Sequence, residues 1–292
     1  MNGTPRELTR NHSRLFQNQK YVYPVVSRRS RGLSIGINIS PTCLCNFLCT
    51  YCQVNGVYRQ QRESHTGTLT VDLAVLEQEL RKTVAAALDG TLFEIPEFAQ
   101  IPLNQRHFND IAFSGDGEPT LSPMFRETMQ TALNVHQELC PETVKIVLIT
   151  NATTFHLPQT AETLSRMMEH HGEIWAKLDA GTEDLYRRIN RSKVPFFTVL
   201  RNLEMMSQWK PIVIQSIFLS QDGVSPPPEQ IGYYIDRLKH LLDIGGRIDR
   251  VQLYTIARST LESWVSPLRE EQMEAISEQV SRETGLTAEV FC

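Results

Sequence analysis

Long apolar runs are missing from this sequence. No stretch reaches the roughly 18 consecutive apolar residues at which a segment becomes a candidate membrane helix. The opening residues, MNGTPRELTRNHSRLF, contain no apolar core of the kind found in a secretory signal peptide. We therefore expect a cytoplasmic protein with no membrane association.

The sequence also has no large excess of charge of either sign. It carries 29 Lys and Arg against 33 Asp and Glu, a formal net charge of -4. This balance provides no general attraction to nucleic acid. Hydrophobic residues make up 41% of the chain, which is enough to build a core and argues against wholesale disorder.

Cysteine is scarce, with 6 residues in 292, and most of it is clustered. Cys43, Cys45, Cys49 and Cys52 fall within one short segment, PTCLCNFLCTYC. In a reducing compartment, clustered thiols more often hold a metal or perform redox chemistry than form disulfides. Free thiols without such a role are expected at the two remaining positions, Cys140 and Cys292.

Apolar runs rich in Val and Ile alternate with helical patterns, which is typical of βα units around a parallel sheet. Strands are predicted at 33–39, 109–114, 145–150, 173–178, 212–219 and 251–257. Right-handed crossovers leave either an open doubly wound sheet or a full or partial barrel. We expect one α/β domain over 33–292, preceded by an N-terminal extension over 1–32.

Helix start and stop signals separate the predicted strands. One helix is predicted to begin at Thr70 and end at Gly90, and Ser122 and Pro123 are predicted as the N-cap and first residue of the next. Gly285 closes the last helical pattern. In both candidate architectures ligands bind at the carboxyl ends of the strands, and the unusual residues of this sequence follow strands.

Cys45, Cys49 and Cys52 have C-x3-C-x2-C spacing, which places three thiols in one loop. A structural zinc site normally has four protein ligands, and Cys43 is too near Cys45 for both to reach one ion easily. A redox dithiol in CTYC would leave Cys45 unexplained. A [4Fe-4S] cluster normally has four thiolate ligands, so three would leave one iron open to a small molecule.

The C-x3-C-x-aromatic-C pattern, with Tyr51 as the aromatic residue, resembles the signature of radical S-adenosylmethionine (SAM) enzymes. The resemblance implies that Cys45, Cys49 and Cys52 ligate a [4Fe-4S] cluster. It also implies that SAM chelates the open iron through its amino and carboxylate groups, and that Cys43 takes no part. The implied fold is the six-stranded partial (β/α)6 barrel of this superfamily, which matches the independent strand count.

A second motif, FSGDGEPTL, follows the second predicted strand. It is similar to the family motif that holds the SAM amino group, which implies that role for Gly115, Gly117 and Glu118. Glycines let backbone carbonyls approach an ammonium group closely, and a glutamate can accept hydrogen bonds from it. This agreement at the next strand end supports the resemblance.

Motifs after later strands supply further candidate contacts for SAM. LITNATT resembles the family's Thr-Asn-Gly and points to Asn151, although Ala152 replaces the glycine. Asp179 ends the fourth strand, where the family places polar residues near the SAM carboxylate or ribose; alternatively, it caps the following helix. The last two strands offer three more candidates for the cofactor cavity: Ser216, Tyr254 and Arg258.

YCQV, SGDGEPTL and LDAGTEDLYRRIN together look most like iron–sulfur oxidoreductases related to wyosine-base synthases, which modify tRNA. Those enzymes carry additional cysteines for a second cluster or a basic face for tRNA, whereas this sequence has no second set of cysteines and no strongly basic balance. The resemblance implies that SAM is cleaved reductively to methionine and a 5′-deoxyadenosyl radical, which abstracts hydrogen from a substrate. It also implies a one-electron donor of the flavodoxin or ferredoxin type.

Several substrate classes remain open. The acidic pI of about 6.1 favours a small molecule, whereas the arginines of SRRSRG and VYRQQRE favour a tRNA base. A protein substrate, as for glycyl-radical activating enzymes, is a third alternative. A non-enzymatic iron–sulfur redox sensor or electron carrier would need no SAM pocket.

Overall fold

The computed structural model describes residues 16–40, 43–53, 70–258, 260 and 262–292, which form two compact units. The described residues of the first unit lie within Met1–Leu44, Ser64–Ile149 and Pro158–Glu173. Those of the second unit lie within Cys45–Glu63, Thr150–Leu157 and Ile174–Cys292. The predicted boundary at residue 32 stays a prediction, and VYRQQRE, at 57–63, lies outside the described residues.

A twisted sheet organises the first unit. Its strands, in sheet order, are β1 (Val22–Ser27), β2 (Gly32–Ile37), β3 (Phe108–Phe113) and β4 (Lys145–Thr150). β1 is antiparallel to β2, whereas β2, β3 and β4 are parallel. Ile35, Ile111 and Ile146 lie in register across the three parallel strands, so apolar side chains form a continuous buried row.

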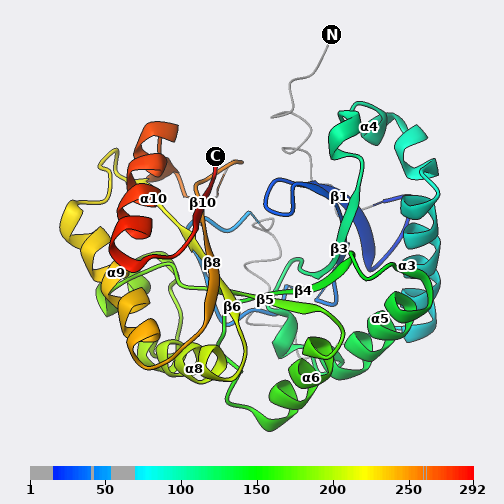
Figure 1. Cartoon of the computed structure of the whole chain (residues 1–292), viewed down its shortest axis with the longest axis horizontal. Coiled ribbons are helices and arrows are strands. Elements are labelled where there is room, and N and C mark those ends of the chain that lie inside the picture. Colours follow the sequence, from blue (N-terminus) through cyan, green and yellow to red (C-terminus); the bar gives the residue numbers. More distant parts are fainter. Residues whose placement is uncertain (1–15, 41–42, 54–69, 259, 261) are drawn as a thin grey trace. The chain divides into compact units, whose positions relative to one another are not determined.

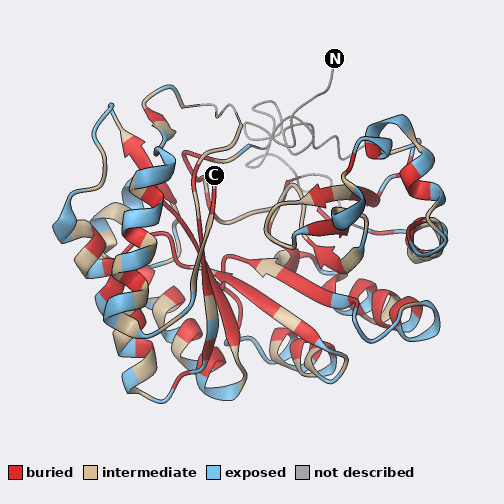
Figure 2. Ribbon diagram, turned by 45° about the horizontal axis from the view of Figure 1, so that its top comes forward, coloured by how far each residue is buried: buried red, intermediate tan, exposed pale blue. Residues whose placement is uncertain are grey.

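Helices cover one side of this sheet, as Figure 1 shows for α3, α5 and α6. The longer helices of the first unit are α3 (Leu73–Leu88), α5 (Phe125–Leu139) and α6 (Pro158–Met168). Its short helices are η1 (Thr91–Glu94), α4 (Pro96–Ala99), η2 (Leu103–Gln105) and η3 (Pro119–Leu121). The helices bury their inner residues and expose the opposite side (Figure 2).

The second unit repeats the β/α alternation. Its main strands, in sheet order, are β5 (Gly172–Lys177, from Ile174 onward), β6 (Ile212–Ile217), β8 (Ile248–Tyr254) and β10 (Ala288–Phe291). They are all parallel, and β7 (Leu219–Gln221) and β9 (Val265–Pro267) form a separate antiparallel pair. The helices are α7 (Glu183–Ile189), α8 (Phe196–Trp209), α9 (Pro228–Asp243) and α10 (Glu270–Thr284).

All six predicted strands are confirmed, as β2, β3, β4, β5, β6 and β8. β1 was not predicted as a strand, because Pro24 interrupts its β-branched pattern. The Glu79 carboxylate of α3 accepts hydrogen bonds from the backbone N–H groups of Lys20, Tyr21 and Val22. A tertiary contact therefore holds the chain where β1 begins.

Two predicted helix starts are displaced in the structure. α3 begins at Leu73, with Asp72 as its N-cap, rather than at Thr70. The prediction that Ser122 is the N-cap of the next helix is wrong, because Pro119–Leu121 form η3 and Ser122 ends it. α5 consequently begins at Phe125, after Met124. The predicted closing glycine of α10, Gly285, has a φ of 74° and is confirmed.

A buried carboxyl on β3 makes the stability of the first unit dependent on pH. Burial raises the pKa of Asp110 from 3.8 to about 6, although the Ser34 hydroxyl donates a hydrogen bond to it. The folded chain favours the neutral acid. Asp110 therefore contributes to the free energy of unfolding below pH 4, and this contribution is lost as the pH rises through 6. The pKa difference lowers the free energy of unfolding by about 3 kcal/mol in all.

Between pH 4 and pH 7, the free energy of unfolding of Asp110→Asn should therefore fall less than that of the wild type. Urea unfolding at a series of pH values measures this difference. Parallel pH profiles for the two proteins would contradict the assignment. Glu138→Gln, a change at an exposed carboxyl paired with Arg81, serves as the control because the solvent screens that pair.

None of the helices in the described part of the chain has the length and apolar character needed to cross a bilayer.

Candidate functional site

The cysteine segment from residue 45 to residue 53 is fixed against the end of α7 in the second unit. Leu48 donates a backbone hydrogen bond of 2.9 Å to the carbonyl of Asn190, and Thr50 donates one of 2.8 Å to that of Ile189. The Ser192 hydroxyl donates to the carbonyl of Asn46 at 2.9 Å. These contacts define the path of the loop that carries Cys45, Cys49 and Cys52.

Two of the three sulfur atoms receive N–H groups. The backbone N–H of Phe47 donates to Cys45 Sγ at 3.4 Å, and the side-chain amide of Asn190 donates to Cys49 Sγ at 3.5 Å. Such donors are typical of thiolate ligands, whose negative charge they stabilise. Burial, with smaller contributions from Asp179 and Cys52, raises the pKa of the Cys49 thiol to about 11, so metal binding at this sulfur would release a proton.

The chemistry of the donor set fits an iron–sulfur cluster, since the loop offers only soft sulfur ligands. Within residues 16–40, 43–53, 70–258, 260 and 262–292, however, no three His, Cys, Asp or Glu side chains converge so that they could hold one metal ion. A [4Fe-4S] cluster does not require such convergence, because each of its thiolate ligands binds a different iron.

Asp179, two residues after the end of β5, lies at the centre of a buried hydrogen-bond network. Its carboxylate accepts from the Tyr51 hydroxyl, from the Asn190 amide at 2.8 Å and from the backbone N–H of Ile217 at 3.2 Å. It also forms an ion pair of 3.3 Å with Lys177, and its side chain is only 1% exposed. The network links the aromatic residue of the cysteine motif to the ends of β5, β6 and α7.

Lys177 extends this network toward β8. Its ammonium lies 5.2 Å from the ring centre of Tyr51 and 4.8 Å from that of Tyr254, and it donates to the Tyr254 hydroxyl. Burial alone would lower the pKa of Lys177, but Asp179 and Tyr254 outweigh this effect and raise it. Burial and the Asp179 charge also raise the pKa of Tyr51, so the phenol keeps the proton that it donates.

Asn151, a predicted candidate, lies beside the cysteine loop. Its side-chain amide donates to Asn46 Oδ1 at 2.7 Å, and Asn46 donates in turn to the Thr153 hydroxyl at 2.9 Å. Ala152, which stands where the family has glycine, adopts a φ of 61°, the left-handed conformation that glycine favours.

The glycine motif of the first unit forms a tight turn. A Cβ on Gly117 would lie 2.3 Å from the carbonyl oxygen of Leu44, so only glycine fits there. Gly115 has a φ of 153° and packs against Asn38. The Glu118 carboxylate accepts from the Thr120 N–H and hydroxyl and so caps η3. The predicted contact between Glu118 and the SAM amino group stays a prediction.

Ser216 lies on the helix-covered face of β6, where its hydroxyl is 2.7 Å from that of Tyr234 on α9. The preceding residue, Gln215, points the other way and lies in register with Lys177 and Gln252. The structure therefore brings Cys45, Tyr51, Asn151 and Asp179 to one end of the second unit. It places Ser216 apart from them, and its role toward SAM stays untested.

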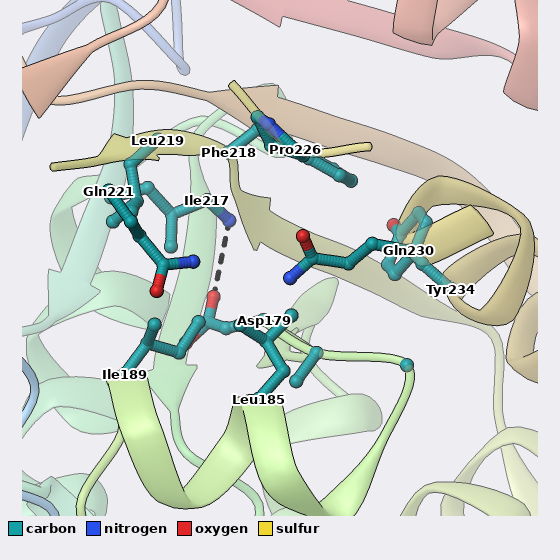
Figure 3. Close-up of a pocket in the computed structure, with 12 residues that line it drawn as sticks. Asp179, Leu185, Ile189, Ile217, Phe218, Leu219, Gln221, Pro226, Gln230 and Tyr234 are labelled. Atoms are coloured by element: carbon teal, nitrogen blue, oxygen red, sulfur yellow. Dashed lines mark hydrogen bonds between the residues drawn. The ribbon is translucent and has the colours of Figure 1, made fainter. Parts of the chain in front are cut away.

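A small pocket adjoins Asp179 on the side of α9. Figure 3 shows the side-chain amides of Gln221 and Gln230 directed toward it. The Asp179 carboxylate accepts a hydrogen bond from the backbone N–H of Ile217. Most of the other lining is apolar: Ala180, Gly181, Leu185, Ile189, Ile217, Phe218, Leu219, Pro226 and Tyr234. Asp179 thus belongs both to the lining of the pocket and to the hydrogen-bond network of the cysteine loop.

The remaining cysteines have no partner sulfur in the described chain. Cys43 is fully buried in the first unit, with a φ of 60°. Burial raises the pKa of Cys140 to about 12. The Cys140 thiol is therefore neutral at physiological pH.

Two residues of the network, Asn190 and Lys177, were not predicted from the sequence. Asn190 follows RRI at the end of α7, where an asparagine usually indicates only a helix end. A lysine directly before Leu178 and Asp179, at the end of an otherwise buried strand, is the one local signal of an ion pair.

The sequence comparisons give a distant relative only, and no family model matches the chain. A protein named GTPase Obg, from Brachyspira hyodysenteriae, is 25% identical over 276 residues. That alignment covers 92% of this chain but only 35% of the relative, so the chain spans about a third of its length.

Solved structures give a clearer result. A radical SAM methyltransferase from Sphaerobacter thermophilus aligns with a TM-score of 0.59 and 14% identity, covering 92% of this chain and 68% of that one. Archaeal TYW1 aligns with a TM-score of 0.48 and 14% identity, covering 87% and 73%. The likeness to the methyltransferase confirms the predicted fold class, and the chain has the α/β fold of the radical SAM enzymes.

Proposed function

We propose that this protein is a radical SAM enzyme that binds a [4Fe-4S] cluster through Cys45, Cys49 and Cys52. The observation that carries the proposal is the cysteine loop itself, in which N–H donors face two of the sulfur atoms. The radical SAM fold supports it. When bound, such a cluster supplies the electron for reductive cleavage of SAM to methionine and a 5′-deoxyadenosyl radical, which abstracts hydrogen from the substrate.

The residues around the loop would hold and orient these groups. Phe47 and Asn190 stabilise thiolate charge, and α7 holds the backbone of the loop. Gly115, Gly117 and Glu118 are proposed for the SAM amino group. Further proposed contacts of SAM, by the family resemblance, are Tyr51, Asn151, Asp179 and Ser216.

Tyr51 and Asp179 already hydrogen-bond each other in a buried network. Their first effect is therefore to fix the cysteine loop relative to β5, because a buried carboxylate with several donors has little freedom to move. Exclusion of water by the surrounding apolar residues would protect a reactive radical.

The proposed partner is an electron-transfer protein of the flavodoxin or ferredoxin type, and the proposed location is the cytoplasm. Among substrates, we favour a small molecule because the net charge of -4 offers no general attraction to RNA. A tRNA base and a protein are the alternatives that the substrate screen should include.

A second candidate function is a non-enzymatic iron–sulfur redox sensor or electron carrier, which the cysteine loop alone would also fit. We do not propose GTP hydrolysis, although one relative is named a GTPase. The printed sequence contains no G-x4-G-K-[ST] segment, the loop that binds nucleotide phosphates in P-loop GTPases.

Glu118→Ala should weaken SAM binding about tenfold or more, because a hydrogen bond to a charged group is worth about 1.5–3 kcal/mol. The measurement is the SAM concentration that half-converts the paramagnetic spectrum of the reduced cluster. Iron content should not change. Asp116→Ala, in the same turn, is the control, since its carboxylate accepts from Asn38. Unchanged SAM affinity in Glu118→Ala would remove Glu118 from the site.

A further inference from the structure

Asn190 is the residue that joins the cysteine loop to the buried Asp179. It is the C-cap of α7, is only 1% exposed, and accepts the backbone N–H of Leu48 through its own carbonyl. Its position is therefore set by both the helix and the loop. A side chain so placed does not need to order itself when a ligand binds.

The side-chain amide of Asn190 faces three acceptors. Its Nδ2 lies 2.8 Å from Asp179 Oδ2, 3.3 Å from the Tyr51 hydroxyl and 3.5 Å from Cys49 Sγ. The opposite orientation would bring the amide oxygen against the Asp179 carboxylate, which would be repulsive. The anion thus fixes one N–H toward itself, and the second N–H lies between the Tyr51 hydroxyl and the Cys49 sulfur.

The amide oxygen of Asn190 is buried without a hydrogen-bond partner among the described residues. An unsatisfied buried oxygen destabilises the folded chain. The hydrogen bonds of the two N–H groups must therefore determine how the amide is oriented. The N–H groups are therefore the part of this side chain that the site uses.

We propose that Asn190 is a positioning residue that raises the reduction potential of the cluster by donating an N–H group to the Cys49 thiolate. This inference rests on the proposed function. Reduction adds one electron to the cluster and makes its thiolates more negative, so a fixed N–H donor stabilises the reduced state more than the oxidised one. Asp179 holds the amide in this orientation through charge.

The test is a redox titration of the reconstituted full-length protein, followed by paramagnetic resonance. Asn190→Leu has a similar shape without the donor, and Asn190→Ala avoids any clash. Both should be harder to reduce, by about tenfold in the equilibrium constant, which corresponds to 59 mV for one electron. A potential equal to that of the wild type would overturn the proposal.

Asn202 provides a matched control. It is also a buried asparagine of the second unit, but its amide donates to the carbonyl of Ala152 at 2.7 Å. Asn202→Leu and Asn202→Ala should disturb packing to a similar degree and leave the potential unchanged. An equal shift in the Asn202 variants would show a general packing effect and would also overturn the proposal.

A measurement on the wild type keeps the proposal testable if the Asn190 variants fail to fold. The iron–sulfur stretching bands should shift when the protein is folded and reconstituted in D2O instead of H2O. Selective 15N labelling of asparagine should give a weak nitrogen coupling to the reduced cluster. Absence of that coupling would overturn the inference, while a spectrum still changed by SAM would leave the proposed function standing. A wild type that binds no cluster would overturn both.

Discussion

Cys49→Ala is expected to lose the cluster almost completely, with iron and acid-labile sulfide falling about tenfold or more after anaerobic reconstitution. Cys49 is one of three proposed ligands, and it is the buried one that Asn190 contacts. With two thiolates left, the loop cannot hold a four-iron cluster stably. The absorbance of the cluster and a direct iron assay measure the loss.

Cys43→Ala is the matched control for this experiment. Cys43 lies two residues before Cys45, yet it is fully buried in the first unit and already adopts a φ of 60°, which alanine accepts as readily as cysteine does. The variant should keep its iron. If Cys43→Ala and Cys49→Ala lose iron equally, the ligand assignment is wrong.

Asp179→Ala should cost about 3–5 kcal/mol in the free energy of unfolding, because it leaves the Lys177 ammonium without its counter-ion. The Asp179 side chain is 1% exposed and that of Lys177 is 16% exposed, so water cannot readily replace the lost contact. Tyr51, Asn190 and Ile217 also lose their acceptor. Urea unfolding of the cluster-free protein gives the value directly.

Removing the lysine as well should recover part of this loss. In Asp179→Ala with Lys177→Met, no unpaired charge remains, and we expect about 1–3 kcal/mol to return. Glu283→Ala removes one partner of the exposed Lys239–Glu283 pair and should change stability far less. A double variant less stable than Asp179→Ala alone would contradict the role of the ion pair.

The β/α framework was predictable because its signals are local. Val- and Ile-rich runs such as KIVLIT and IVIQSI are buried on both faces of a parallel sheet, and glycines close the helices. β1 was missed because Pro24 interrupts its pattern, and the Glu79 carboxylate that holds its first residues lies far away in the sequence. The prediction of Ser122 as a helix N-cap was wrong because Pro119–Leu121 form η3 and Ser122 is its C-cap.

The candidate site was predictable only as far as short motifs reach. The thiols and Tyr51 share one motif, and Asp179 follows a predicted strand. Sequence spacing alone therefore identifies them as candidate site residues. Asn190 and Lys177 act through contacts with Cys49, Tyr51 and Asp179 that exist only once the strand, loop and helix have come together. No spacing rule encodes such a network.

The most direct test of the central claim is to incubate the reconstituted, chemically reduced protein with SAM in the absence of oxygen and to measure 5′-deoxyadenosine and methionine by mass spectrometry. We predict that both products form with the wild type and that neither forms with Cys49→Ala. An intact cluster that produces no 5′-deoxyadenosine, and whose spectrum does not change with SAM, would contradict the radical SAM assignment and favour the electron-carrier alternative.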